Sequence, residues 1–309
     1  MPSPTPWSQT DIPPLAGQTV LVTGANRGLG LVLASQFAMH GAHVVVAGRD
    51  MAKLALAVAS IRNGAPRADV EPMSIDMADL ASIRRFADKF AATHGKLDVL
   101  CHNAAAIMVP HGRTVDGFES HIGTNHLGPF ALTGLLLDSL RAAPAARIVS
   151  TGSLAHRMSS GLDLDDSDYA RRRYKEMDAY GASKIAALSF TFELDRRLRR
   201  AQLPIRAVAA HPGYTATNTD LGNAFIRLST KLFAQSPAIG ALPMLYAATA
   251  PDVRSGEYFG PSGFKELRGA PRRVQASETA SDATLGARLW NWSQAATGVH
   301  YLDAATSPA

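Results

Sequence analysis

The sequence predicts an α/β protein with a doubly wound parallel sheet in a single domain. Short β-branched runs alternate with longer segments of helical period, and this alternation is typical of parallel strands joined by crossover helices. Right-handed crossovers place those helices on both faces of the sheet. The strand runs are nearly continuous in valine, isoleucine and leucine, as expected when both of their faces are buried.

The elements follow one another in a regular order. β-branched runs predict strands over residues 19–24, 43–47, 70–76, 97–103, 147–150 and 205–210. Apolar residues at helical spacing predict helices over residues 28–40, 51–62, 80–94, 118–141 and 179–201. Each predicted helix therefore joins two successive strands, and the sequence shows no fixed-period repeat or internal linker.

The two ends of the chain differ from this central region. Residues 1–15 include five prolines among the first fourteen positions and no basic stretch followed by an apolar one, so we expect a loose tail without a secretory signal. We expect residues 16–265 to form the sheet domain. After Phe259 the chain is rich in Gly, Pro, Arg and Ser before a short helix over residues 285–292, so residues 266–309 are expected to form an extension packed on that domain.

Composition excludes several classes of protein. With 46% hydrophobic and 18% charged residues, the chain is too apolar for a disordered protein. A net charge of +5 permits anion binding without indicating a nucleic-acid partner. The single cysteine, Cys101, excludes a disulfide framework and fits a reducing compartment, so we expect a cytoplasmic protein. No apolar run is long enough for a membrane span.

A glycine-rich turn lies between the first strand and the first helix, where a tight turn and a helix N-terminus suit a pyrophosphate. Its residues are Thr23, Gly24, Ala25, Asn26, Arg27, Gly28, Leu29 and Gly30. The alternative is an ordinary strand-to-helix turn. The second strand ends in Gly48-Arg49, whereas proteins that prefer NAD(H) have an acid there to bind the ribose hydroxyl. Arg49 and Arg27 could bind the 2′-phosphate of NADP(H), so the sequence favours NADP(H) over NAD(H). The alternative is that both arginines are solvated surface residues.

Tyr180 and Lys184 are one helical turn apart and share a helix face. A lysine ammonium about 5 Å from a phenol would lower its pKa by roughly two units from about 10. We therefore expect Tyr180 to exchange a proton with an alcohol or carbonyl oxygen near neutral pH.

These residues, taken with others in order along the chain, resemble the short-chain dehydrogenase/reductase superfamily and its Rossmann fold. The resemblance covers about residues 15–265. Within the superfamily, residues 124–130 and 153–156 look most like the retinol-dehydrogenase-like branch. The ordered motifs are the 23–30 turn, Asp76, Asn103-Ala104-Ala105, Asn125, Ser153, Tyr180 with Lys184, and Pro212-Gly213.

The resemblance implies a role for each motif. Tyr180 would be the general acid and base, Lys184 would bind the nicotinamide ribose, Ser153 would bind the substrate oxygen, and Asn125 would hold a water that relays protons. Asp76 and Met77 would meet the adenine, and Asn103, Ala104 and Ala105 the adenosine side. The nicotinamide carboxamide would be covered by Pro212, Gly213, Thr215 and Thr217.

Each motif also has a structural interpretation. Ser153 could be a plain strand-end residue, Asn125 a helix residue bonded to nearby backbone, and Asp76 a helix cap. Two departures from the family pattern stand out. Ala105 replaces a glycine, which requires a negative φ at that position. Ser153 also precedes Tyr180 by 27 residues, about twice the family spacing, because of an insertion over residues 162–178.

We expect an NADP(H)-dependent oxidoreductase that interconverts an alcohol and a carbonyl, with an apolar small-molecule substrate. The alternatives are a non-catalytic NADP(H)-sensing regulatory protein and a double-bond reductase resembling protochlorophyllide reductase. No metal site is expected, because the histidines show no ligand spacing. The apolar residues between Leu221 and Tyr246 could form a substrate lid or simply pack as a helix. A homo-oligomer through the long helices is left open, since the C-terminal extension could block that surface.

Overall fold

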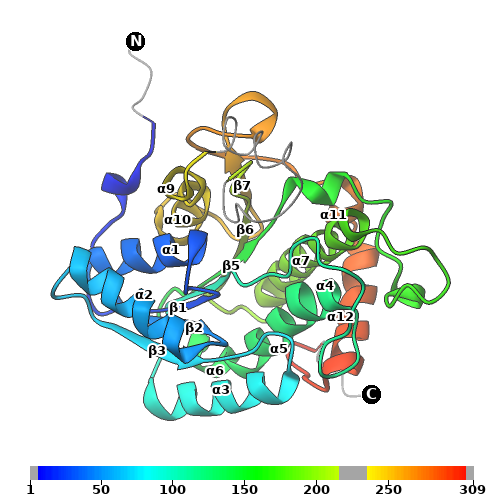
Figure 1. Cartoon of the computed structure of the whole chain (residues 1–309), viewed down its shortest axis with the longest axis horizontal. Helices are drawn as coiled ribbons and strands as arrows, with labels where there is room; N and C mark the ends of the chain where they lie inside the picture. Colours follow the sequence, from blue (N-terminus) through cyan, green and yellow to red (C-terminus); the bar gives the residue numbers. More distant parts are fainter. Residues whose placement is uncertain (1–5, 216–234, 304–309) are drawn as a thin grey trace.

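The computed structural model describes residues 6–215 and 235–303, whose strands form one eight-stranded sheet (Figure 1). Their order is β3-β2-β1-β4-β5-β6-β7-β8, and all described neighbours are parallel except β7 and β8. The bounds are β1 (Thr19–Thr23), β2 (His43–Gly48), β3 (Val70–Ser74), β4 (Val99–His102), β5 (Arg147–Thr151), β6 (Arg206–Ala210), β7 (Tyr258–Pro261) and β8 (Pro271–Arg273). The doubly wound parallel sheet is confirmed.

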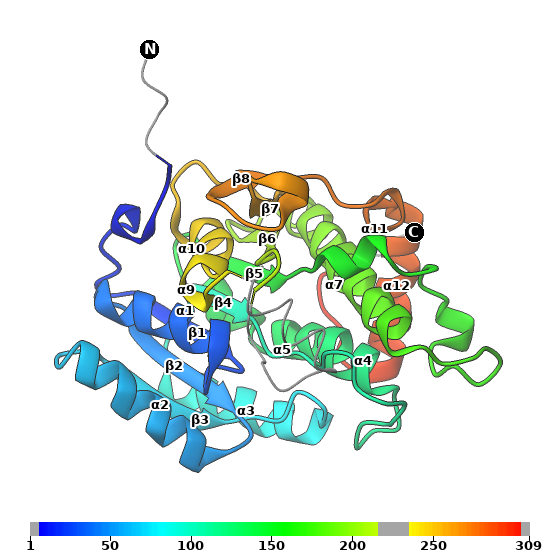
Figure 2. The ribbon, with the colours of Figure 1, turned by 45° about the horizontal axis from the view of Figure 1, so that its top comes forward.

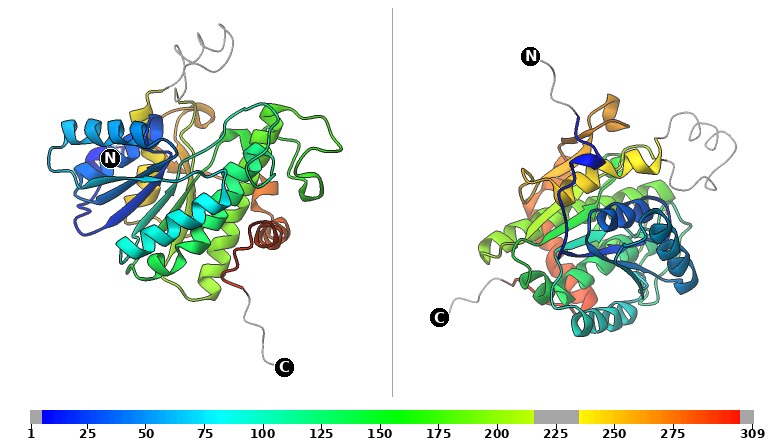
Figure 3. Two further views of the ribbon diagram at one scale, coloured as in Figure 1. Left: turned by 60° about the horizontal axis from the view of Figure 1, so that its bottom comes forward. Right: turned by 90° about the vertical axis from the view of Figure 1, so that its left-hand side faces the viewer.

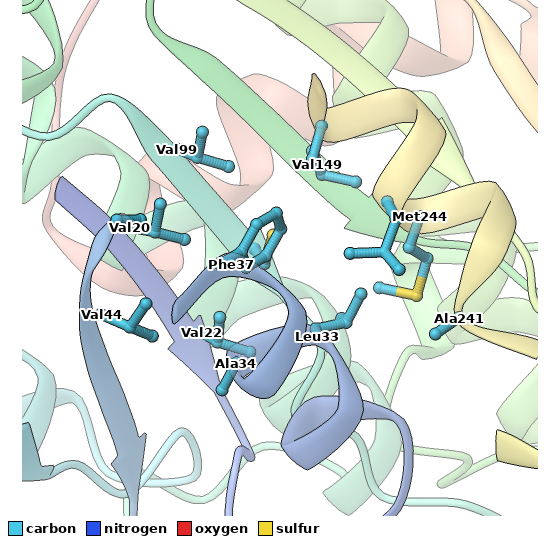
Figure 4. Packing of buried hydrophobic residues seen from close by; sticks show 14 of the residues in the cluster. Val20, Val22, Leu33, Ala34, Phe37, Val44, Val99, Val149, Ala241 and Met244 are labelled. Carbon is cyan, nitrogen blue, oxygen red and sulfur yellow. The ribbon is translucent and has the colours of Figure 1, made fainter. Parts of the chain in front are cut away.

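Helices cover both faces of the sheet (Figure 3). On one face lie α1 (Gly28–Met39), α2 (Met51–Gly64), α9 (Pro237–Gly240) and α10 (Leu242–Thr249), and on the other lie α3 (Leu80–Thr93), α5 (Gly128–Leu135) and α7 (Glu176–Arg200). Side chains alternate between the two layers, as a strand requires. Leu33 and Phe37 of α1 pack with Val22 and Val149 of the sheet in the first cluster (Figure 4), whereas Leu21 belongs to the second.

The order of the strands reverses between β1 and β4. From β1 the chain proceeds outward through β2 to β3, then crosses back to β4 on the other side of β1. In open α/β sheets the loops at the carboxyl ends of the strands separate at this switch point and leave a crevice. The fold therefore places a binding cleft beside the turn that follows β1.

The helix predicted over residues 118–141 is divided into several pieces. They are α4 (Ser120–Ile122), a π-helical turn η2 (Gly123–Leu127), α5 and α6 (Leu137–Arg141). Pro129 lies in the first turn of α5 and has no N–H to donate, so the hydrogen-bond ladder is interrupted there. Apolar periodicity does not reveal such a break, because the buried face stays continuous through it.

The N-terminal segment differs from the loose tail expected through residue 15. The ring of Trp7 meets that of Tyr246 edge-on at 5.3 Å, and the short helix η1 (Gln9–Asp11) follows. Ile12 and Leu15 are buried in the first core cluster. Three apolar side chains thus anchor a segment whose proline content had suggested an unpacked chain.

The C-terminal segment runs back along α7. After η5 (Phe264–Glu266) and β8 come α11 (Glu278–Ser281) and α12 (Ala283–Thr297), and α12 lies beside α7 (Figure 2). The ring of Trp290 is buried against Phe130, and the Arg197 guanidinium lies 4.4 Å from the centre of that indole. Among the helices of the described residues, none combines the length and apolarity needed to cross a bilayer.

Candidate active site

A cleft of about 840 Å³ opens at the carboxyl ends of the parallel strands. Its walls come from the turns after β1, β2 and β3, from the loops after β4, β5 and β6, and from the start of α7. The predicted site residues that line it are Gly24, Asn26, Arg27, Gly28, Leu29, Gly30, Arg49, Asp76, Met77, Asn103, Ala104, Ala105, Ser153, Tyr180, Lys184, Pro212, Gly213 and Thr215. Asn125 lies behind this wall. Thr217 lies outside the described residues, as do the candidate lid positions 221–234.

The turn after β1 is shaped for an anion. Gly24 and Gly28 have φ values of +67° and +57°, a conformation that glycine adopts without strain. No side chain caps the first turn of α1, whose backbone therefore faces the cleft with its N–H groups available. The Asn103 side chain donates to the carbonyl oxygens of Thr23 and Gly24, which fixes the turn against the loop after β4. These features fit a dinucleotide pyrophosphate.

Gly30 holds the strand and helix close together. A Cβ at this position would lie 2.4 Å from the Gly24 carbonyl oxygen and 2.5 Å from the Asn103 side-chain nitrogen. A side chain there would separate α1 from β1 and displace the turn. Ala105, which replaces the family's glycine, is not among the described residues with positive φ, so alanine is accommodated without backbone strain.

Two arginines line the cleft beside this turn. Arg27 and Arg49 are exposed, and neither guanidinium group has a hydrogen-bond or ion-pair partner in the part of the chain that is described. The neighbouring carboxylate, Asp50, is directed to Lys53, from whose backbone it accepts a hydrogen bond. This bond lowers the pKa of Asp50. The two guanidinium groups therefore remain available to a phosphate.

Ser153, Tyr180 and Lys184 meet in the cleft beyond the end of β5. Ser153 caps the turn η3 (Leu154–Arg157) and forms a hydrogen bond with Tyr180. The Nζ atom of Lys184 lies 5.7 Å from the centre of the Tyr180 ring and donates a hydrogen bond to the Thr151 carbonyl oxygen at 2.8 Å. The insertion over residues 162–178 does not move Ser153 away from Tyr180. Asp178 accepts hydrogen bonds from Ser159 and Ser160, so the inserted residues loop outward and return at the start of α7.

Electrostatics at this triad differ from the expectation. Desolvation raises the pKa of Tyr180, and the hydrogen bond with Ser153 opposes that shift. Desolvation also lowers the pKa of Lys184 to about 8. The predicted acidification of Tyr180 by Lys184 is therefore wrong for the free protein. The ammonium is held by the Thr151 carbonyl and is itself weakened by burial, so it does little to offset desolvation of the phenolate.

The side chain of Asn125 forms hydrogen bonds with the backbone of Ala106. Its oxygen accepts from the Ala106 N–H at 2.8 Å, and its nitrogen donates to the Ala106 carbonyl at 2.9 Å and to Ser183 Oγ at 2.9 Å. Ser183 Oγ in turn donates to the Tyr180 carbonyl oxygen. Asn125 thus links the loop after β4 to the helix that carries Tyr180. Both of its amide hydrogens are used, so neither remains for a water.

Comparison with known proteins points to one family. A sequence model for the family "short chain dehydrogenase" matches residues 18–162. Retinol dehydrogenase 13 of Homo sapiens is 37% identical over 292 residues, which covers 89% of this chain and 83% of the relative. The protein belongs to the short-chain dehydrogenases. It lies in their retinol-dehydrogenase-like branch, so it is an NAD(P)-dependent oxidoreductase that acts on CH–OH groups.

Two further matches extend this dehydrogenase's relationships. Polyprenol dehydrogenase of Mus musculus is 37% identical over 292 residues, covering 90% of this chain and 83% of the relative. The crystal structure of an uncharacterized protein from Mycobacterium paratuberculosis has a TM-score of 0.81 and 40% identity, with 96% of this chain and 98% of that one covered. The likeness therefore includes the C-terminal segment as well as the Rossmann core.

This short-chain dehydrogenase has a second polar cluster that sequence reasoning missed. Glu119 caps α4 and accepts from the backbone of His121, whose Nε2 accepts from the Val109 N–H at 3.2 Å. Tyr174, from the insertion, donates to the Val109 carbonyl oxygen. The cluster fixes the 107–110 segment of the cleft wall. No motif spacing could have revealed it, because its members come from three separate loops.

A third group supports the loop after β6. His211 is buried and lies 2.9 Å from Glu266, which also pairs with Arg157. The hydrogen bond with His211 and the pairing with Arg157 lower the pKa of Glu266 to about 2. His156 Nε2 accepts from the Ser277 N–H. His211 therefore has a structural role, because its backbone N–H donates to the Phe259 carbonyl oxygen of β7 and its Nδ1 accepts from the Gly213 N–H of the cleft wall.

Proposed function

We propose that the protein is an NADP(H)-dependent oxidoreductase that interconverts an apolar alcohol and its carbonyl compound, with Tyr180 as proton donor and acceptor. The observation that carries this proposal is the meeting of Ser153, Tyr180 and Lys184 at one end of a cleft whose other end is an anion-binding turn. A bound nicotinamide would supply or accept the hydride.

The chain would hold the dinucleotide along the whole cleft. The first turn of α1 binds the pyrophosphate, and Arg27 and Arg49 bind the 2′-phosphate that distinguishes NADP(H). Asp76, Met77 and the 103–105 loop line the adenosine side. The Pro212–Thr215 wall covers the nicotinamide end, and Thr217 extends this assignment beyond the described residues.

The proton chemistry follows from the contacts of Tyr180. Its raised pKa keeps the phenol protonated at neutral pH, so a proton is present for transfer to a carbonyl oxygen during reduction. Ser153 hydrogen-bonds the same oxygen. In oxidation Tyr180 must accept a proton, which requires a higher pH. A relay water at Asn125 would bind main-chain atoms of η2, since the side-chain N–H groups are already used.

An apolar substrate is supported by the wall opposite Tyr180. Ile107, Met108, Val109 and Pro110 line the cleft there. Relatives named retinol dehydrogenase and polyprenol dehydrogenase match most of the chain. The double-bond reductase alternative has less support, because Cys101 is buried in β4 with a pKa raised to about 12 and cannot act as a proton donor in the cleft. A cytoplasmic location stays a prediction.

Replacing Tyr180 by Phe tests the proposal. We expect turnover to fall by about 10²–10⁴-fold, because the transferred proton loses its donor. Fluorescence titration should show NADPH affinity within about threefold of the wild type, since the phenol contributes little to phosphate binding. Tyr246→Phe is the matched control, because Tyr246 bonds Asp252 outside the cleft and its loss should leave turnover unchanged.

Two results would count against the assignment. Undiminished turnover in Tyr180→Phe would remove Tyr180 from the chemistry. A wild-type protein that binds NADPH but oxidises it with none of a panel of apolar aldehydes and ketones would instead support the sensing alternative.

A further inference from the structure

Three potential metal ligands lie close together at the amino ends of the strands, on the side of the sheet opposite the cleft. His43 begins β2, Glu71 lies on β3, and His94 ends α3. The two Nε2 atoms are 3.3 Å apart, and Glu71 Oε1 lies 2.7 Å from His94 Nε2 and 3.6 Å from His43 Nε2. The cluster is therefore independent of the candidate active site.

Hydrogen bonds to the far side of each ring determine which nitrogen is protonated. His43 Nδ1 lies 3.0 Å from the Asp69 carboxylate, so it carries the hydrogen. His94 Nδ1 faces the Phe90 carbonyl oxygen at 3.2 Å and Thr93 Oγ1 at 2.8 Å. Thr93 already donates its own hydrogen to the Lys89 carbonyl oxygen, so it accepts from His94. In its neutral form, each ring would therefore present an Nε2 lone pair to the cluster.

Three acceptors thus face one another. Without a metal, a proton held between Glu71 Oε1 and His94 Nε2 accounts for their 2.7 Å separation, and a metal ion would replace that proton. Two ligand atoms bound to a tetrahedral Zn²⁺ at about 2.05 Å are about 3.3 Å apart, which matches the separation of the two Nε2 atoms. Glu71 Oε1 lies 2.7 Å from His94 Nε2 and 3.6 Å from His43 Nε2, so this half-exposed side chain would shift by about half an ångström to bind the same ion. The outer contacts from Asp69 and Phe90 are those that orient metal-bound imidazoles in proteins.

The surroundings favour a fixed yet accessible site. The His94 ring stacks on Phe90 at 4.4 Å between centres and meets the His43 ring at 5.3 Å, so neither imidazole is free to rotate away. The exposed fractions of the side chains are 27% for His43, 9% for His94 and 43% for Glu71, which leaves room for a water as the fourth ligand. Imidazole and carboxylate ligands suit Zn²⁺.

We propose that His43, Glu71 and His94 form a zinc-binding site that ties the edge strand β3 to β2 and α3. The separation of the ligands along the chain explains why sequence analysis expected no metal. His43 and His94 are 51 positions apart, and only the parallel pairing of β2 with β3 and the return of α3 bring them together. A metal here stabilises an edge strand that otherwise lacks a neighbour on one side.

Calorimetric titration of the full chain with ZnCl₂ tests the site, using protein without a histidine tag and treated with a chelator. We expect one Zn²⁺ per chain with a dissociation constant in the micromolar range or below. His94→Gln and Glu71→Gln should each weaken binding at least tenfold. Asp69→Ala, which removes only an outer contact, should weaken it by about tenfold with the stoichiometry retained. The control His300→Gln removes an exposed histidine outside the cluster and should change nothing.

Melting curves separate a lost site from a lost fold. At a 100-fold excess of Zn²⁺ over the dissociation constant, the melting temperature of the wild type should rise by about 5 °C. His94→Gln should unfold cooperatively without this rise. The proposal is overturned if the wild type binds no Zn²⁺, or if the His94 and Glu71 variants bind it as the wild type does. Neither result would affect the function proposed for the cleft.

Discussion

At the scale of single residues, the proposed preference for NADP(H) rests on the arginine that follows β2. Arg49 is exposed, lines the cleft and has no partner within residues 6–215 and 235–303. Arg49→Ala should therefore raise the KM for NADPH by about 10–100-fold, the value of a lost charge-assisted hydrogen bond, while KM for NADH changes less than about twofold. Steady-state kinetics with both cofactors measure this. Arg85→Ala, on α3, is the control.

In the proposed mechanism, Ser153 would influence the pH at which Tyr180 acts as a base. Its hydrogen bond lowers the pKa of Tyr180 against the effect of desolvation. Ser153→Ala removes that bond, so the folded-state pKa rises and the alcohol-oxidation profile of kcat/KM should move to higher pH. The carbonyl-reduction rate should fall without losing its low-pH plateau, because the protonated phenol persists there. An unshifted oxidation profile would show that Ser153 does not contact the phenol during turnover.

Motif spacing predicts the positions of Tyr180, Lys184 and the 23–30 turn because each depends on one element and its immediate neighbours. The environment of Tyr180 could not be predicted in the same way. Its pKa depends on how deeply the first turns of α7 lie in the cleft, and the contacts of Asn125 depend on the path of the loop after β4. Side chains whose partners come from distant loops leave no local pattern.

At the scale of elements, α12 packs against α5 and α7 through a single aromatic side chain. Trp290 is 1% exposed and packs against Phe130, Phe190 and Tyr301. Trp290→Ala should lower the free energy of unfolding by about 3–5 kcal/mol, as large deletions in a core do. Urea denaturation measures this. Arg288→Ala, on the exposed side of α12, should cost less than about 0.5 kcal/mol. Equal effects would contradict the assigned packing.

The predicted strands and most predicted helices agree with the structure to within a few residues. Their buried faces leave long, regular patterns of apolar residues in the sequence. The elements that were missed are short or depend on context. β7 and β8 have four and three residues and include prolines, and α9 has four. Periodicity cannot be recognised over so few positions. The break at η2 could not be predicted from the sequence, because it changes the hydrogen bonding of the helix without changing the apolar pattern.

At the scale of the whole molecule, buried neutral histidines should make folding sensitive to acid. His102 and His126 bond Thr133 and Ser293 through Nε2, and burial lowers the pKa of each to about 3 from 6.5. Below pH 6.5, these two histidines bind protons in the unfolded chain but stay neutral in the folded chain. Stability should therefore fall as the pH decreases from 6.5 towards 3, by about 1.4 kcal/mol per pH unit for each histidine.

Urea midpoints between pH 7.5 and 4.5 measure this loss. That window isolates histidines, since carboxylates such as Glu266, with a pKa of about 2, lose their contribution only below the unfolded value of 4.5. His126→Gln should flatten the slope, whereas the exposed His300 should not affect it. A slope that is the same in His126→Gln as in the wild type would show that His126 is protonated without cost.

The return of α12 along α7 has a consequence for synthesis on the ribosome. Phe130 and Phe190 are made early, but the residues that cover them, Trp290 and Tyr301, emerge about a hundred or more positions later. Domains form as units once their sequence is available. The aromatic centre of this layer therefore stays solvent-exposed or bound by a chaperone until the residues through Tyr301 have been translated.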